Sequence, residues 1–405
     1  MTELVKFDGL PAPVSGPVDL LIVAGEHSGD EHAANMVREL LVKRPGLNVC
    51  ALGGPRLAVA GAQLLRDLTA NSTMGFAAVL GKISYYRALI ADVVRWVGAF
   101  RPRAVCFVDS SGLNLRIAQG LFNRGYSAKA GGKTKTLYYI SPQIWASRAG
   151  RRFEMARHLD GLAAIFPFEP ACYADTTLPV EFVGHPFVSP DYAAPVAFDP
   201  NGPVLLLPGS RRQVVARIFP VLLKAYQLSG TSRNAVVLYP SEDILVTLQQ
   251  ANPPANVSFR SLAEGSVRPP DAPNADGRPS GPSRPQSPVA ASAVLTASGT
   301  MSMHCALAGI PGAITYRTDP LTYLLGRMLV KVEYIGIANL LLKSPMYPEF
   351  IQRAATPAAL AAQLRECLDS PQRVEQTQTA ATKLRALLHA PTKGTAADWV
   401  ARQLV

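Results

Sequence analysis

The sequence predicts an α/β protein made of two doubly wound, parallel-sheet domains. Short runs rich in Val, Leu and Ile alternate with segments of helical period, which is typical of strands buried on both faces and separated by helices. This alternation occurs twice, on either side of a stretch at 186–203 that is rich in turn residues and has little periodicity. Each series is long enough to bury a core of its own.

Ten strands are expected, five in each series. They are 20–23, 49–52, 104–108, 136–140 and 162–166, followed by 204–207, 235–239, 257–260, 293–296 and 312–316. We place the first domain at 1–190 and the second at 191–375. Residues 376–405 are expected to form helices that either cap the second domain or cross back to the first.

The segment 265–288 carries seven prolines and no hydrophobic pattern. Such a sequence cannot contribute a core element, so we expect a surface loop there.

The composition excludes several classes of protein. Of the 405 residues, 48% are hydrophobic and 17% charged, the reverse of a disordered chain. The five cysteines form no CxxC pair, which argues against a disulfide framework or a zinc site and fits a reducing cytoplasm. No segment resembles a signal peptide or a membrane-spanning helix. The net charge of +11 favours an anionic partner, and the dispersed basic residues make nucleic acid the weakest candidate.

The first predicted strand ends in the turn AGEHSGDEHAA, which leads into a helix expected to begin near Asp30. Ligands of open parallel sheets bind at the carboxyl ends of strands. Glu26 and Asp30 are therefore candidates to accept hydrogen bonds from substrate hydroxyls, whereas the alternative makes Asp30 the cap of its own helix. The glycine spacing is not the dinucleotide fingerprint, and His27 and His32 match no metal-ligand spacing.

Asp109 follows the predicted strand 104–108 directly. A carboxylate at that end of a parallel strand is well placed to act as a general base. It is equally well placed to cap the helix that we expect to begin near Leu113. The residues alone leave both interpretations open.

The strongest sign of an anion site is LLLPGSRRQ, where the strand 204–207 runs into a helix. A helix N-terminus offers unpaired amides and partial positive charge, and Arg211 and Arg212 add donors suited to a diphosphate. A second turn, TASGTMSMH, follows the strand 293–296 and begins a helix at Thr300. Two such turns at strand ends favour nucleotide binding over a pair of ordinary Ser/Gly turns.

Two further regions have a functional and a structural interpretation. In SPQIWASRAGRR the residues Gln143 and Trp145 are expected to end a strand, and the arginines that follow either hold a phosphate or decorate a solvated helix. The helix expected at 80–100 carries a second apolar stripe that includes Tyr85, Leu89 and Trp96. That stripe either dips into a bilayer surface, takes up acyl chains, or packs in the core.

Taken together, these motifs resemble the lipid-A-disaccharide synthase family, glycosyltransferases with two facing Rossmann-like domains of the GT-B type. The likeness spans residues 19 to about 352, and so many ordered motifs are far more specific than any single one. They are AGEHSGD from Ala24, GGPRLAVAG from Gly53, MGFAAVL from Met74, SPQIWASR from Ser141, FPFEPACY from Phe166, FVGHPF from Phe182, PGSR from Pro208, SGT from Ser298, IAN ending at Asn339 and PEFIQ from Pro348.

The resemblance implies transfer of 2,3-diacylglucosamine from its UDP conjugate to the 6-hydroxyl of 2,3-diacylglucosamine 1-phosphate, with inversion at the anomeric carbon. The products would be a β-1,6 disaccharide of lipid A assembly and UDP, and neither a metal nor a cofactor is expected. The implied partners are the two acylated sugars and an anionic membrane surface, at the cytoplasmic face of the inner membrane. A homodimer is compatible with the sequence.

The family pattern also implies roles for individual residues. Asp109 is expected to be the base, and Arg211 the catalytic cation that steadies the departing UDP. Glu26 and Asp30 would line the acceptor side. The other expected substrate-binding residues are Ser28, Met74, Gln143, Trp145, Arg148, Ser210, Ser298, Gly299, Thr300, His304, Asn339, Glu349 and Gln352.

Several acids of the family pattern are missing. Ala78, Gly112, Val214 and His304 stand where the family carries acids, and Ser147 stands where it carries a tryptophan. His304 can still hydrogen-bond a ribose hydroxyl. These departures leave two alternatives: a weakened relative that binds a UDP-sugar or lipid without turnover, or another GT-B enzyme such as a sugar-nucleotide epimerase.

Overall fold

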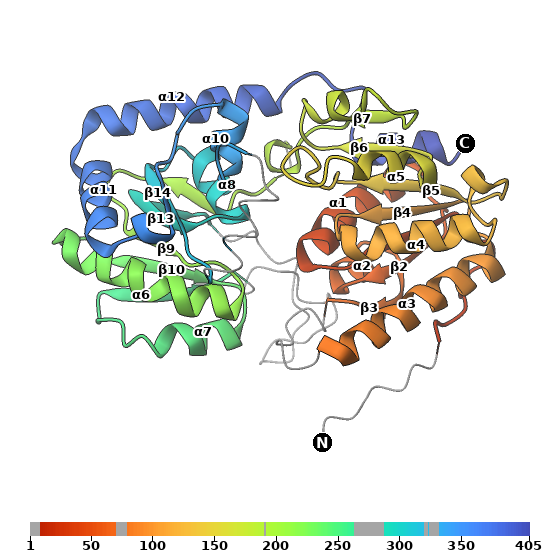
Figure 1. Ribbon diagram of the computed structural model, residues 1–405, viewed down its shortest axis with the longest axis horizontal. Coiled ribbons are helices and arrows are strands. Elements are labelled where there is room, and N and C mark those ends of the chain that lie inside the picture. The colour runs from red at the N-terminus through yellow and green to blue at the C-terminus, as the bar shows by residue number, and fades with distance from the viewer. Residues whose placement is uncertain (1–8, 70–78, 190–191, 263–286, 320–322, 324–331) are drawn as a thin grey trace. The chain divides into compact units, whose positions relative to one another are not determined.

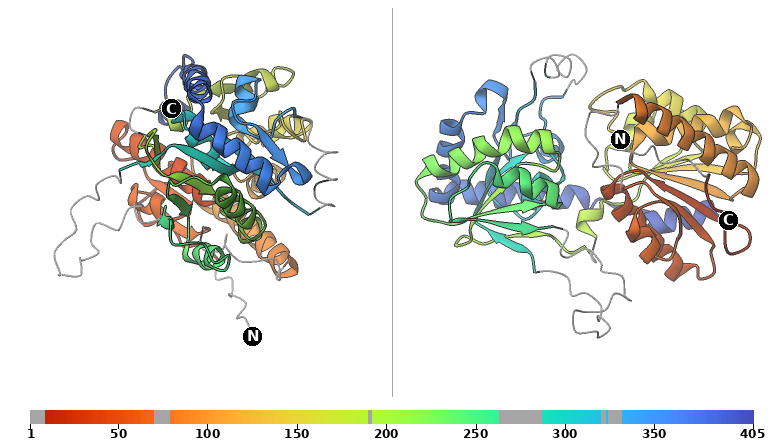
Figure 2. Two further views of the ribbon diagram at one scale, coloured as in Figure 1. Left: turned by 90° about the vertical axis from the view of Figure 1, so that its left-hand side faces the viewer. Right: turned by 90° about the horizontal axis from the view of Figure 1, so that it is seen from below.

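The computed structural model describes residues 9–69, 79–189, 192–262, 287–319, 323 and 332–405 (Figure 1). The chain divides into two compact units: unit 1 is Met1–Pro186 with Ala390–Val405, and unit 2 is Phe187–His389. Each unit contains a parallel sheet with helices on both faces (Figure 2). The predicted fold class is therefore confirmed.

Unit 1 has a seven-stranded sheet in the order β3-β2-β1-β4-β5-β6-β7, with every neighbouring pair parallel. The strand order changes direction between β1 and β4, which is where open α/β sheets bind ligands. The strands are β1 Leu20–Ala24, β2 Val49–Gly53, β3 Gln63–Asp67, β4 Ala104–Val108, β5 Lys135–Tyr139, β6 Gly161–Ala164 and β7 Val180–Phe182. The helices are α1 His27–Lys43, α2 Pro55–Val59, α3 Val79–Phe100, α4 Ser111–Asn123 and α5 Arg151–His158, joined by α13 Ala396–Gln403.

Unit 2 has a six-stranded parallel sheet in the order β11-β10-β9-β13-β14-β15, and its strand order changes direction between β9 and β13. A separate parallel pair joins β8 to β12. The strands are β8 Val196–Phe198, β9 Val204–Leu207, β10 Ala235–Tyr239, β11 Val257–Ser261, β12 Val289–Ala291, β13 Ala293–Ala297, β14 Gly312–Tyr316 and β15 Glu349–Ile351. The helices are α6 Arg212–Ser229, α7 Glu242–Gln249, α8 Thr300–Leu307, α10 Ile337–Leu342, α11 Pro357–Asp369 and α12 Pro371–Leu388.

The expected strands were found, and five more were missed. The missed strands are β3, β7, β8, β12 and β15. They lie at sheet edges or in the small pair, four of them have three residues each, and their residues are mostly half-buried. β8 lies inside the stretch at 186–203, where the sequence has little periodicity. Because edge strands bury only part of their surface, they lack the continuous apolar runs of β1 or β9.

Helix starts also differ from the prediction. α1 begins at His27, three residues before Asp30, and α4 begins at Ser111 rather than near Leu113. α1 begins with polar residues and a glycine, and α4 begins with Ser111 and Gly112, so in both cases the helix starts before its apolar period does.

The core explains the two apolar stripes of α3. Leu89 and Trp96 are buried in the cluster that also holds Phe107 of β4, and Tyr85 packs against that cluster. Phe100 is exposed at the end of the helix. The second stripe is therefore mostly core, and the membrane-facing interpretation is wrong for Leu89 and Trp96.

The chain returns to unit 1 after α12. Trp399 of α13 is buried, and a Cβ built on Gly161 of β6 would come within 3.1 Å of its ring. Lys43 of α1 pairs with Asp398 at 2.6 Å. The last helix is therefore part of the core and surface of unit 1, while α11 and α12 pack on unit 2.

Some expectations fall on residues that lie outside the described part of the chain. These are Met74, Ala78 and all but the last two residues of the proline-rich segment 265–288. None of the described helices combines the length and apolarity that a membrane crossing requires.

Candidate functional site

The carboxyl edge of the sheet in unit 1 gathers most of the motifs that the sequence singled out. The strands β1, β4, β5 and β6 are consecutive neighbours in the sheet. Because all are parallel, the loops that follow them emerge at the same edge. These loops carry Glu26, Asp109, Trp145 and Glu169 in spatial order.

Asp109 sits in a tightly held, unusual backbone conformation. Its φ is 50° and that of Ser110 is 42°, so two successive side-chain-bearing residues lie in the left-handed region. The Asp109 amide donates to the Tyr139 carbonyl at 3.1 Å, and its carbonyl accepts from Asn114 Nδ2 at 2.9 Å and from the Tyr138 hydroxyl. Such strain persists only where surrounding contacts impose it, and it clusters at functional sites.

The environment of the Asp109 carboxylate favours a proton acceptor. Burial raises its pKa above the ordinary value, the nearby Glu26 carboxylate raises it further, and the Ser110 amide opposes both. The N-cap of α4 is Ser110, whose side chain makes no capping hydrogen bond. Asp109 therefore precedes the N-cap and does not occupy the capping position of α4, while its role as a general base stays a prediction.

Asp30 has a structural role that the sequence did not reveal. Its buried carboxylate accepts from the Gly54 amide at 2.8 Å, the Arg56 amide at 3.2 Å and the Leu57 amide at 3.3 Å. It therefore caps α2 from inside α1 and does not cap its own helix, whose N-cap is Glu26. Glu26 and His27 are exposed and Ser28 is half-buried, so these three are accessible polar residues of the turn.

The loop after β5 is anchored by a buried acid. Gln143 and Trp145 lie beyond the end of β5, and Trp145 Nε1 donates to Glu169 Oε1 at 3.3 Å. Glu169 is 1% exposed, and its Oε2 accepts from the amides of Ile165 and Phe166 at 3.2 and 3.1 Å. Burial raises the pKa of Glu169 to about 7, against the lowering effect of these three donors. Sequence analysis gave Glu169 no role of its own, although an acid inside the aromatic run of the motif FPFEPACY was the available signal of such an anchor.

The three arginines of this region differ in their engagement. Arg151 donates to Ser111 Oγ at 3.1 Å, and Arg152 pairs with Asp175 at 2.6 Å. Arg148 and Gln143 are exposed. Arg151 and Arg152 would have to give up these contacts to bind a ligand. Among the described residues of unit 1, Arg148 has no such contact to break.

In unit 2, the turn PGSR provides an open helix N-terminus. Gly209 takes a φ of 108°, which only glycine adopts readily, and the chain then enters α6 at Arg212. Ser210 and Arg211 are exposed, and among the described residues no side chain caps α6. The first amides of the helix, with Arg211 beside them, form a cationic surface suited to phosphate oxygens.

The turn SGT lies next to it. β13 pairs with β9 so that Thr296 is opposite Leu207, and both strands lead directly into their turns. Ser298 Oγ donates to the Ile335 carbonyl at 3.0 Å, and α8 begins at Thr300 after Gly299. The two predicted anion-binding turns are therefore neighbours at the carboxyl edge of the sheet in unit 2.

Three predicted substrate-binding residues of unit 2 are engaged within the protein. The buried Asn339 amide donates to the Tyr347 carbonyl at 2.7 Å and to Glu349 Oε1 at 2.8 Å. Glu349 accepts from the amides of Ile335 and Gly336, both at 2.9 Å. The Gln352 side chain binds both the amide and the carbonyl of Thr318, at 2.9 and 3.0 Å. These residues shape the loops at the sheet edge, and direct contact with substrate stays a prediction.

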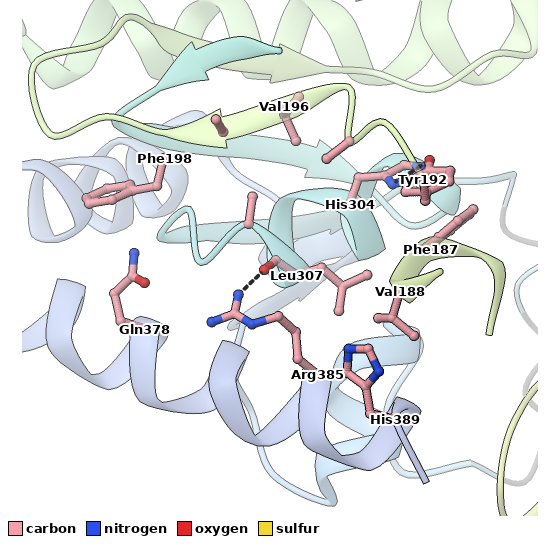
Figure 3. Close-up of a pocket in the computed structure, with 13 residues that line it drawn as sticks. Phe187, Val188, Tyr192, Val196, Phe198, His304, Leu307, Gln378, Arg385 and His389 are labelled. Carbon is pink, nitrogen blue, oxygen red and sulfur yellow. Dashed lines mark hydrogen bonds between the residues drawn. The ribbon is translucent and has the colours of Figure 1, made fainter. Parts of the chain in front are cut away.

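His304 faces a pocket of unit 2. Its ring lies 4.0 Å from that of Phe187 and is parallel to that of Tyr192, whose hydroxyl is 3.2 Å from the ring nitrogens. The pocket has a volume of about 490 Å³, and Arg385 of α12 borders it while donating to the Leu307 carbonyl (Figure 3). A ribose contact for His304 stays a prediction.

Two other departures from the family pattern lie in helix first turns. Gly112 is exposed in α4, and a Cβ built on it would meet no other atom within 4 Å. Val214 is half-buried in α6, where it borders Gly209. Space alone therefore does not explain the loss of the acid at Gly112.

Comparisons with known proteins agree with one another. The family model described as lipid-A-disaccharide synthetase matches residues 20–258 and 280–403. A lipid-A-disaccharide synthase from Geobacter metallireducens is 34% identical over 388 residues, which cover 91% of this chain and 92% of the relative.

Solved structures show the same fold at low identity. CalG4, the calicheamicin glycosyltransferase, superposes with a TM-score of 0.54 at 13% identity, covering 96% of this chain and 98% of the other. UDP-GlcNAc 2-epimerase from Neisseria meningitidis, bound to UDP-GlcNAc, gives 0.55 at 12% identity, covering 92% and 99%. At such identities the likeness concerns the fold alone.

Replacing Asp30 by Ala should destabilise unit 1, because three amides at the start of α2 lose their acceptor. We expect a loss of about 2–4 kcal/mol in the free energy of unfolding, measured by urea denaturation. Glu31→Ala is the matched control, since Glu31 contacts the same helix through an exposed ion pair with Arg56 and should cost less than about 1 kcal/mol. Equal stability of the two variants would show that the Asp30 carboxylate is not a cap.

Proposed function

The chain belongs to the lipid-A-disaccharide synthase family, and from that premise we propose how its residues divide the reaction. It is a glycosyltransferase that transfers 2,3-diacylglucosamine from its UDP conjugate to 2,3-diacylglucosamine 1-phosphate in lipid A assembly. The fold likeness to an epimerase, at 12% identity, carries no function, so the epimerase alternative has no support beyond the fold.

We assign the base of the reaction to Asp109 in unit 1. The acceptor 6-hydroxyl attacks the anomeric carbon, the new C–O bond forms as the bond to UDP breaks, and Asp109 takes the hydroxyl proton. Attack opposite to the leaving group inverts the anomeric carbon. The observation that carries this proposal is the strained, hydrogen-bonded turn that holds a carboxylate of raised pKa at the switch point of the sheet.

Unit 2 is proposed to hold the UDP. The amides that begin α6 and α8 would bind the diphosphate, and Arg211 would oppose the negative charge that grows as UDP departs. In this proposal, amide dipoles and a guanidinium supply the stabilisation, and the mechanism is independent of a metal ion. Ser210 would assist from the same turn.

Association with the membrane follows from the substrates. Both substrates carry acyl chains, which partition into a bilayer, and a net charge of +11 favours an anionic surface. On α3, Tyr86 and Phe100 are exposed large hydrophobic residues. We therefore propose that the protein acts peripherally at the cytoplasmic face of the inner membrane, while the homodimer stays a prediction.

The purified protein, incubated with both acylated substrates and excess EDTA, should yield UDP and a β-1,6 disaccharide. Mass spectrometry identifies the product, and the anomeric coupling in its NMR spectrum reports inversion. Loss of product on adding EDTA, restored by a divalent cation, would contradict metal independence. Folded protein without any product would contradict the catalytic assignment itself.

Asp109→Asn should lower kcat by about 100-fold or more, because an amide cannot accept the proton. Asp175→Asn is the control, since that exposed carboxylate of unit 1 only pairs with Arg152.

The pH dependence of the wild-type enzyme gives a second test. Because the pKa of Asp109 is raised, the rate should fall on the acidic side at a pH above the ordinary pKa range of aspartate. Glu26→Gln should move this fall in rate to lower pH by removing a neighbouring charge. An Asp109→Asn enzyme as fast as the wild type would assign the base elsewhere.

A further inference from the structure

Two loops at the carboxyl edge of unit 1 are joined through one side chain. The loop after β5 carries Trp145, and the turn after β6 carries Glu169 at the start of a 3-10 helix, Glu169–Tyr173. Trp145 Nε1 donates to Glu169 Oε1 at 3.3 Å. This is a contact between side chains 24 residues apart, so it ties one loop to the other.

The surroundings of this contact are aromatic. The Trp145 ring meets those of Phe166 and Phe168 edge to face, with centroids 6.3 and 5.5 Å away, and the two phenylalanine rings stack at 5.8 Å. Glu169 is 1% exposed. A buried carboxylate in such a place depends on its few donors, because an unpaired polar group there is costly.

The two carboxylate oxygens of Glu169 accept hydrogen bonds from different donors. Oε2 accepts from the amides of Ile165 and Phe166 and so shapes its own turn. Oε1 accepts from the Trp145 indole, which is only a donor. A glutamine at this position can keep the hydrogen bonds from the two amides through its oxygen, but its NH₂ group would then face the indole N–H and the contact with Trp145 would be lost.

The loop held in this way borders the proposed base. β5 is the neighbour of β4, and the Asp109 amide donates to the carbonyl of Tyr139, the last residue of β5. The loop that carries Trp145 starts directly after that carbonyl. A shift at the start of this loop therefore reaches the turn that carries Asp109 through this hydrogen bond.

We propose that Glu169 is a positioning residue of the transfer reaction, which holds Trp145 and so fixes the loop that follows the strand bonded to the turn of the base. This inference rests on the proposed function. Glu169 does not touch the reacting atoms, and it acts through the indole.

A dependence on pH follows. With the pKa of Glu169 raised to about 7, the carboxyl group takes up a proton as the pH falls through neutrality. The proton goes to Oε1, because Oε2 already accepts two amides, and the protonated oxygen then opposes the indole N–H. Cys172 and Tyr173 interact electrostatically with Glu169, and the pKa values of both are raised by burial, so both stay neutral in this range. His185 packs against the ring of Phe166 with centroids 5.2 Å apart, and Arg152 is the nearby cation that acts on Cys172. The indole is therefore held above pH 7 and released below it.

Glu169→Gln tests the proposal with a change of one atom. In the wild type, the fluorescence of Trp145 should titrate with a midpoint near pH 7, and Trp145→Phe identifies that signal against Trp96 and Trp399. In the wild type, kcat should also change with a midpoint near pH 7, and we call this change the rate step. In Glu169→Gln the fluorescence titration and the rate step should both vanish, and kcat should fall on the order of 10-fold. Glu154→Gln, at an exposed residue of α5, is the matched control and should behave as wild type.

The possible outcomes distinguish the inference about Glu169 from the proposed function. If the wild type turns over and folded Glu169→Gln keeps both the titration and the rate profile, the inference is wrong while the proposed function stands. If Glu169→Gln does not fold, Trp145→Phe must remove the rate step near pH 7 by itself, and its failure to do so overturns the inference. If the wild type forms no product, the proposed function fails, and a positioning role in this reaction fails with it.

Discussion

The chemistry of each unit depends on the common direction of its strands. In a parallel sheet every strand ends at the same edge, so residues far apart in the sequence become neighbours there. Asp109 is the clearest case: the carbonyl of Tyr139 on the adjacent strand fixes its amide, and the chain turns left-handed for two residues. The same geometry places the turns at Gly209 and Gly299 side by side in unit 2.

Carboxylates that accept backbone amides support these edges in a second way. Asp30 and Glu349 each accept hydrogen bonds from at least two backbone amides of another segment. Glu169 accepts two from the amides of its own turn. All three lie in motifs that resemble the family, and two of them were expected to touch substrate. In this protein, an acid inside such a motif is often the group that holds a loop in shape, while more exposed neighbours such as Glu26 and Arg211 face solvent.

The fold was largely predictable because its central strands are continuous apolar runs. The strands Val204–Leu207 and Ala235–Tyr239 were predicted with their observed bounds. Edge strands such as Gln63–Asp67 mix polar and apolar residues and were missed. The family and the positions of the motifs were also within reach of sequence, whereas hydrogen-bond partners were not. The contact of Asp30 with α2, or of Glu169 with Trp145, joins residues more than 20 positions apart and leaves no local pattern.

The central claim is that unit 2 binds UDP through the backbone amides at the N-termini of α6 and α8. Amide hydrogen exchange with and without UDP tests it most directly, because exchange reports each backbone amide. The account predicts slower exchange at residues 211–215 and 300–303, and no change at 110–114 in unit 1. Saturating UDP that leaves both segments of unit 2 unprotected would contradict the account.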